Sequence, residues 1–320
     1  MARPSRPRHG ARMFESSFVS PAADNAEIFF TAWPIEKRRA IVLIAHGAAE
    51  HAARYARVAG VLNKAGYGVA ALDHRGHGRT GQAAKLGVFA DEDGWNRAVG
   101  DIHQLVNRTR DYHPGEPVVL LGHSMGSIMT QQYIAEHGDS IDAAVLSGSA
   151  LIDGFSDLVP LIEAEVAASG REAPSRVMAE LMGGGFSTGI ENARTGFDWL
   201  SRDQQEVQAY IDDPLCGFEL SAGAWLDMIK HNRVPKHAAD FLSIPKELPL
   251  YVFAGECDPV NQNLGALQEL LRRYATAGLR NVAWRFYAGA RHELLNEINR
   301  EQASTDLLHW LDAHIAPASV

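Results

Sequence analysis

The pentapeptide G-H-S-M-G at residues 122–126 constrains the fold of this 320-residue chain more than any other feature. It follows an apolar run at 117–121 and precedes a helix-compatible stretch at 127–137. A strand that reverses sharply into a helix leaves the central residue, Ser124, in a strained backbone conformation with its hydroxyl exposed. Side chains two positions to either side would collide with the turn, which explains the glycines. We therefore expect a nucleophilic serine here, although a chain with 29 glycines can also produce such a pentapeptide by chance.

Apolar runs and helix-like stretches alternate along the chain. The runs lie at 40–45, 68–72, 118–121, 143–147, 249–254 and 282–287. The stretches with helical character lie at 51–65, 92–112, 125–137, 262–277 and 299–314. Near-continuous apolar runs are typical of strands that are covered on both faces. The alternation predicts an α/β fold with a doubly wound, mostly parallel sheet. Segments 13–19 and 27–33 instead alternate apolar and polar residues, so we expect antiparallel strands at the sheet's first edge.

The alternation stops between residues 151 and 248. This stretch has no clean strand pattern, and its helix-like pieces lie at 157–168, 175–182 and 223–230. We expect a helical cap, or lid, inserted over the sheet's C-terminal edge, with a flexible Gly-Gly-Gly hinge at 183–185. The core domain would then consist of residues 13–150 and 249–320.

Three apolar residues of the insertion are candidates for contact with a substrate. They are Leu158, Phe186 and Trp225. The alternative is that each of them only builds the insertion's own hydrophobic core, as most apolar side chains do.

A serine hydroxyl needs a histidine base, and the base needs an acid that holds it in the right tautomer. In sheets of this kind the chain order is serine, acid, histidine. Asp258 lies in a turn after the run at 249–254, and His292 follows the run at 282–287. Both fall at the C-terminal ends of predicted strands, where such sheets place ligands. We interpret Ser124, Asp258 and His292 as the candidate catalytic residues.

Two further positions bear on this interpretation. Glu256 is a rival acid, and an Asp before Pro, as at Asp258, is often only a turn former or helix cap.

The loop H-G-A-A-E-H at 46–51 follows the run at 40–45 and is placed to supply one oxyanion donor. The other donor would be the N–H of Met125, directly after the serine.

Neither a metal nor another cofactor is predicted. His46, His51 and His74 lack a carboxylate at ligand spacing on one face, so they do not form a recognisable metal site. No glycine-rich phosphate loop follows a predicted strand, which argues against a nucleotide cofactor.

Charge and composition argue against several classes of binding partner. The net charge of −9 argues against nucleic-acid binding. The two cysteines, Cys216 and Cys257, offer no disulfide framework and fit a reducing compartment such as the cytoplasm. No apolar run reaches the roughly 18 residues of a membrane span. Residues 1–12 contain several arginines and no apolar segment follows, so we expect a flexible basic tail. Transient contact of this tail with a membrane surface is an open alternative.

Five motifs together resemble the monoacylglycerol lipase and lysophospholipase branch of the α/β-hydrolases. They are H-G-x-x-E-H at 46–51, D-x-R-G-x-G at 73–78, G-H-S-M-G at 122–126, G-x-x-D at 255–258 and G-x-x-H at 289–292. The resemblance implies an α/β-hydrolase fold, a Ser124–His292–Asp258 triad and an oxyanion hole formed by the N–H groups of Ala48 and Met125. It also implies that the insertion is a lid over an acyl pocket.

The expected activity is hydrolysis of single-chain carboxylic esters through an acyl-enzyme. Its rate should rise through one ionisation near the free histidine value of about 6.5. Two alternatives stay open: a peptidase or amidase on the same fold, and a catalytically silent binding module. The sequence does not indicate an oligomeric state.

Overall fold

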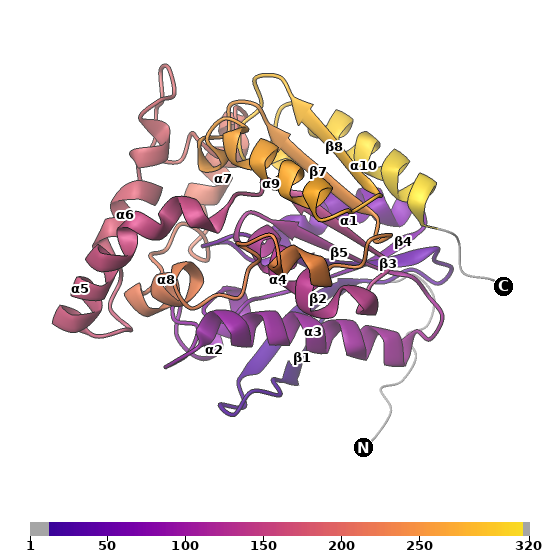
Figure 1. The fold of residues 1–320 in the computed structure, drawn as a ribbon, viewed down its shortest axis with the longest axis horizontal. Helices are drawn as coiled ribbons and strands as arrows, with labels where there is room; N and C mark the ends of the chain where they lie inside the picture. Colours follow the sequence, from indigo (N-terminus) through magenta and orange to yellow (C-terminus); the bar gives the residue numbers. More distant parts are fainter. Residues whose placement is uncertain (1–12, 316–320) are drawn as a thin grey trace.

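A computed structural model describes residues 13–315 and contains one eight-stranded sheet in the order β1-β2-β4-β3-β5-β6-β7-β8 (Figure 1). Pairing is antiparallel between β1 and β2 and between β2 and β4, and parallel across the rest. The predicted doubly wound, mostly parallel sheet is therefore confirmed, including its antiparallel first edge. The strands are β1 Phe14–Val19, β2 Glu27–Trp33, β3 Ala40–Ala45, β4 Tyr67–Leu72, β5 Val118–His123, β6 Ala143–Ser147, β7 Leu250–Gly255 and β8 Val282–Tyr287.

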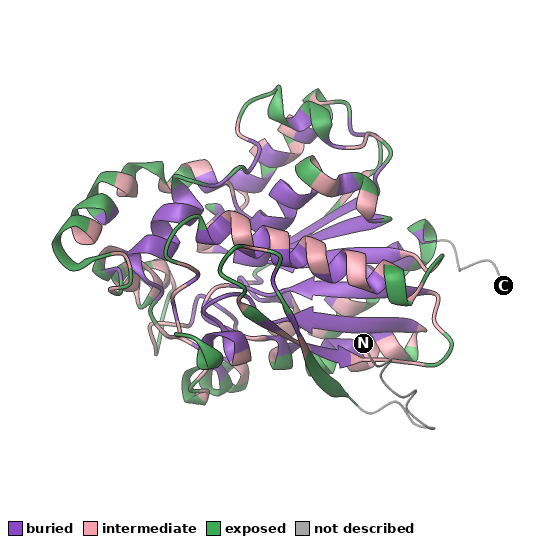
Figure 2. Cartoon of the chain, turned by 90° about the horizontal axis from the view of Figure 1, so that it is seen from below, coloured by how far each residue is buried: buried purple, intermediate pink, exposed green. Residues whose placement is uncertain are grey.

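Helices cover both faces of the sheet because successive side chains of its central strands point to opposite sides. In β3, Val42 and Ile44 belong to a core shared with α1 and α10, whereas Ile41 and Leu43 belong to a core shared with α3, α4 and α9. The inner strands are buried along their whole length and the helices expose their outer sides (Figure 2). These helices are α1 Ala56–Lys64, α3 Gly94–Tyr112, α4 Met125–His137, α9 Gly265–Thr276 and α10 Arg300–His314. A short helix that the sequence did not indicate, α2, spans Gly78–Ala83.

The stretch between β6 and β7, all of which the structure describes, is helical. It adds no strand to the sheet. Its helices are α5 Val159–Ser169, α6 Arg176–Met182, α7 Gln204–Asp212 and α8 Ala222–Ile229. In Figure 1, α5, α6 and α8 lie beside the sheet, at the left. The three helical pieces predicted here are confirmed, and α7 was missed.

The predicted basic tail, residues 1–12, lies outside the described residues. Within residues 13–315, no helix has both the length and the apolar character that crossing a membrane requires.

Candidate active site

Ser124 stands in the sharp turn between β5 and α4. Its backbone has φ 50° and ψ −118°, a combination that few residues other than glycine adopt. A Cβ added at Gly122 would lie 2.4 Å from the carbonyl oxygen of Gly126, and one added at Gly126 would lie 2.1 Å from that of Ala45. The expectation that the turn needs small residues at both positions is therefore confirmed. Ser124 is partly exposed, whereas the residues on either side of it are buried.

His292 and Asp258 are brought together from loops after β8 and β7. The Nδ1 atom of His292 lies 2.8 Å from Oδ2 of Asp258, and both side chains are buried. Because a carboxylate only accepts hydrogen bonds, Nδ1 carries the proton and Nε2 presents a lone pair. That Nε2 atom is buried and has no hydrogen-bond partner among residues 13–315. The imidazole is thus in the tautomer that can accept a proton.

The remaining bonds of Asp258 fix its carboxylate in place. Its Oδ1 accepts the N–H of Val260 at 2.9 Å, and its Oδ2 also accepts Nδ2 of Asn261 at 2.9 Å. Asn261 is fully buried, and no sequence pattern singled it out. The rival acid, Glu256, is exposed.

The loop after β3 lies against Ser124 and leaves one backbone donor free. A Cβ added at Gly47 would lie 3.2 Å from the Cβ of Ser124. The N–H of Gly47 donates to Glu50 at 2.5 Å, and the N–H of Ala49 donates to Nε2 of His77 at 3.0 Å. Between them, the N–H of Ala48 donates to no group in the described part of the chain.

Two further features concern the backbone N–H groups next to Ser124. Met125 is the first residue of α4, so its N–H has no intrahelical acceptor. His77 keeps the loop in place as a neutral acceptor, because burial lowers its pKa to about 4 and its Nδ1 donates to the carbonyl of Arg75. Sequence reasoning missed His77, although it lies in the D-x-R-G-x-G segment.

Aromatic rings surround His292. The ring centres of His123 and Trp199 lie 4.9 and 5.0 Å from that of His292. The N–H of His292 donates to the carbonyl of Trp199 at 3.3 Å, so a segment of the insertion contacts the histidine loop. Nothing in the sequence distinguished Trp199 from the other aromatic residues.

The three candidate substrate contacts lie in different settings. Phe186 is partly exposed, and the centre of its ring lies 5.1 Å from that of Trp199. Trp199 in turn contacts His292, so a single side chain separates Phe186 from the histidine. Trp225, in α8, is buried within the main hydrophobic core, and Leu158 is partly buried against the same core. Of the three, Phe186 therefore has the clearest structural link to the histidine.

The charges near His292 raise its pKa. Burial alone would lower the pKa of this imidazole. The charge and hydrogen bond of Asp258 outweigh that effect, and Glu293 and Glu50 add to the rise. Electrostatics therefore favour the protonated form of His292 more than burial alone would.

One group of side chains could approach a metal ion. The donor atoms of His51, Asp213 and Cys216 lie within 4.8 Å of one another. The carboxylate that His51 lacked in the sequence pattern comes from a distant segment, and Nε2 of His51 lies 2.9 Å from Oδ2 of Asp213. This group shares no residue with the Ser124 site.

The strand order, the strained serine between β5 and α4 and the buried His–Asp pair define the class: this is an α/β-hydrolase. The chain belongs to the family described as serine aminopeptidase, S33, whose profile matches residues 36–299. It lies in the monoacylglycerol lipase-like branch of that fold, as the motifs indicated.

Known proteins of this branch align over nearly the whole chain. A monoacylglycerol lipase of Mycolicibacterium smegmatis is 32% identical over 304 residues, which are 94% of this chain and 98% of the relative. The monoglyceride lipase of Homo sapiens is 29% identical, covering 92% of this chain and 90% of that protein. Among solved structures, a thermostable carboxyl esterase from Bacillus coagulans in complex with glycerol matches with a TM-score of 0.85 and 27% identity, over 95% of this chain and 99% of that chain.

Proposed function

We propose that this carboxylic ester hydrolase cleaves single-chain acyl esters of the monoacylglycerol or lysophospholipid type, with Ser124 as nucleophile, His292 as base and Asp258 as orienting acid. The observation that carries the proposal is the buried His292–Asp258 pair, whose Nε2 has no partner among residues 13–315. Ser124 follows β5, and the pair follows β7 and β8, so all three residues come from the carboxyl ends of parallel strands of one sheet. The named relatives, a monoacylglycerol lipase and a monoglyceride lipase, support the substrate class.

The proposed reaction has two halves. Ser124 Oγ attacks the ester carbonyl carbon while Nε2 of His292 takes its proton. The carbonyl oxygen becomes an oxyanion that accepts the N–H groups of Ala48 and Met125. The C–O bond to the alcohol then breaks, and the imidazolium returns the proton to the leaving alcohol. Water repeats the sequence on the acyl-enzyme and releases the fatty acid.

We further propose that residues 151–248 act as a cap that selects the acyl chain. Phe186 and Trp199 support this role, because they connect the insertion to His292 through ring contacts. Leu158 and Trp225 remain candidates on the strength of the sequence alone.

A panel of substrates tests the proposal. Purified protein would be assayed on p-nitrophenyl esters of increasing acyl length, on monoacylglycerols, on a lysophospholipid and on an aminoacyl p-nitroanilide. We expect the highest kcat/KM on single-chain esters. A higher kcat/KM on the anilide would instead support the aminopeptidase activity that the family description names.

A further inference from the structure

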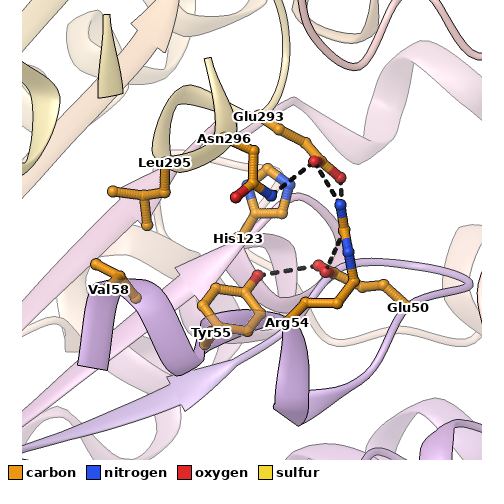
Figure 3. Close-up of a pocket in the computed structure, with 8 residues that line it drawn as sticks. All are labelled: Glu50, Arg54, Tyr55, Val58, His123, Glu293, Leu295 and Asn296. Atoms are coloured by element: carbon orange, nitrogen blue, oxygen red, sulfur yellow. Dashed lines mark hydrogen bonds and ion pairs between the residues drawn. The ribbon is translucent and has the colours of Figure 1, made fainter. Parts of the chain in front are cut away.

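A cluster of three largely buried charged side chains adjoins the candidate site. Figure 3 shows Arg54 between the carboxylates of Glu50 and Glu293. Arg54 Nη1 lies 2.7 Å from Glu50 Oε2 and 2.7 Å from Glu293 Oε1, while Nη2 lies 2.8 Å from Glu293 Oε2. The three side chains are 12%, 3% and 6% exposed for Arg54, Glu50 and Glu293. We call these residues the Glu50–Arg54–Glu293 cluster.

Each carboxylate of the cluster belongs to a loop that carries part of the proposed machinery. Glu50 accepts the N–H of Gly47, and so holds the loop that presents Ala48. Glu293 follows His292 directly in the sequence. A bidentate guanidinium–carboxylate pair fixes orientation as well as distance. Arg54 therefore connects the loop of the proposed oxyanion donor to the loop of the proposed base.

Stability alone does not account for the cluster. Removing three charged groups from water costs more than their mutual attraction commonly returns, so buried ion pairs add little net stability. The cavity that the cluster lines has a volume of about 20 Å³. That is room for about one water molecule and not for an acyl chain. The cluster is thus neither an efficient source of stability nor a substrate pocket.

The charges of the cluster do not cancel. Although burial opposes it, Arg54 holds the pKa of Glu50 and of Glu293 below their ordinary values, so both carboxylates are ionised. Two carboxylates and one guanidinium leave one net negative charge. The neighbouring His123 adds none, because burial and His292 lower its pKa. The charged and titratable groups that act on His292 are Asp258, Glu293, Glu50 and His123, and Arg54 acts on both glutamates.

We propose that Glu50, Arg54 and Glu293 are positioning residues: they lock the Ala48 loop to the His292 loop and leave a net negative charge next to His292. This inference rests on the proposed function, because it assigns His292 as the base. The cluster is then a second source of negative charge near His292, besides the carboxylate of Asp258.

A titration tests the inference without any substrate. The pKa of His292 would be measured by nitrogen-15 NMR in Ser124→Ala protein, alone and combined with Glu293→Gln. We expect Glu293→Gln to lower the pKa of His292, since one negative charge is removed near the imidazolium. The matched control is Glu297→Gln. It removes another buried carboxylate of the same loop, which pairs with Arg202 at 3.0 Å and is not among the leading charges that shift the pKa of His292.

The two outcomes are distinct. A fall in the pKa of His292 in Glu293→Gln but not in Glu297→Gln supports the inference. An unchanged pKa in folded Glu293→Gln, or an equal fall in the control, overturns it. If circular dichroism shows that Glu293→Gln does not fold, Glu50→Gln carries the same test. Because Ser124→Ala protein is used, the titration does not depend on substrate class, whereas absence of ester hydrolysis by the wild type would contradict the proposed function instead.

Kinetics separate charge from geometry. We expect Glu293→Gln to lower kcat roughly 10- to 100-fold, since displacing a catalytic group by about 1 Å can cost 10²-fold. The acidic limb of its kcat/KM profile should move to lower pH. Glu293→Asp keeps the charge on a shorter side chain, so it should lose kcat while its acidic limb stays close to the wild-type position. A purely structural role predicts the same limb position in both variants.

Discussion

The Nδ1 atom of His292 and the Oδ2 atom of Asp258 lie 2.8 Å apart, with each side chain at most 1% exposed. This pair comes from loops after two neighbouring parallel strands, β7 and β8, whose carboxyl ends meet at one edge of the sheet. The contact fixes the tautomer of the imidazole and contributes the charge that most strongly raises its pKa.

Replacing Asp258 tests that contact. Asp258→Asn should lower kcat by up to about 10⁴-fold, because the amide favours the wrong imidazole tautomer. The matched control is Glu256→Gln, two residues away and exposed, which should change kcat little. Steady-state kinetics on a p-nitrophenyl ester measure both. A larger loss in Glu256→Gln than in Asp258→Asn would transfer the acid role to Glu256.

The pH profile follows from the direction of the His292 shift. The base must be neutral, so kcat/KM should rise with pH through one ionisation of the free enzyme and then reach a plateau. From the sequence we expected the midpoint near the free histidine value. Asp258, Glu293 and Glu50 raise the pKa of His292 above 6.5 against the effect of burial, so the expected midpoint moves to higher pH. A midpoint below 6.5 would contradict this electrostatic account.

Replacing Phe186 tests whether the insertion at residues 151–248 selects the acyl chain. Each methylene held in an apolar pocket contributes roughly 0.8 kcal/mol, so selection for long chains is sensitive to its lining. Phe186→Ser should lower kcat/KM for long acyl esters much more than for acetate esters. The control is Leu161→Ser in α5, whose side chain is already 53% exposed. Equal losses on short and long esters in folded Phe186→Ser would rule out the selector role.

Trp225 calls for a different measurement. Because it is buried in the main core, truncation to Ala should destabilise the protein by about 3–5 kcal/mol, as for other large core aromatics. Urea unfolding would measure this change. A loss below about 1 kcal/mol would argue against a core role and favour substrate contact by Trp225.

Metal removal should leave catalysis intact. The proposed reaction uses only side chains and backbone N–H groups, and the His51–Asp213–Cys216 group shares none of them. We expect unchanged kcat/KM after dialysis against EDTA. Activity that EDTA abolishes and zinc restores would overturn this mechanism.

Most of the parallel strands were predictable because they are near-continuous apolar runs; β8, which contains Arg285, is the least continuous of them. The candidate triad was predictable because its members follow such runs in a fixed order. Helix α7 was missed because only Val207 and Tyr210 are buried in it. Its capping residue, Asp203, with Glu206 three positions later, was the available signal. The ion pair between Arg54 and Glu293 joins loops 239 residues apart, and no local pattern encodes such a contact.

Ser124 is the proposed nucleophile, and covalent labelling can identify the residue that reacts. Wild-type protein would be treated with a fluorophosphonate and analysed by intact-protein and peptide mass spectrometry, beside Ser124→Ala and the control Ser147→Ala, whose buried hydroxyl has no hydrogen-bond partner among the described residues. We predict one adduct on Ser124 in the wild type and in the control, no adduct in Ser124→Ala, and a loss of kcat in that variant of roughly 10⁶-fold. Labelling and near-wild-type ester hydrolysis by folded Ser124→Ala would contradict the account.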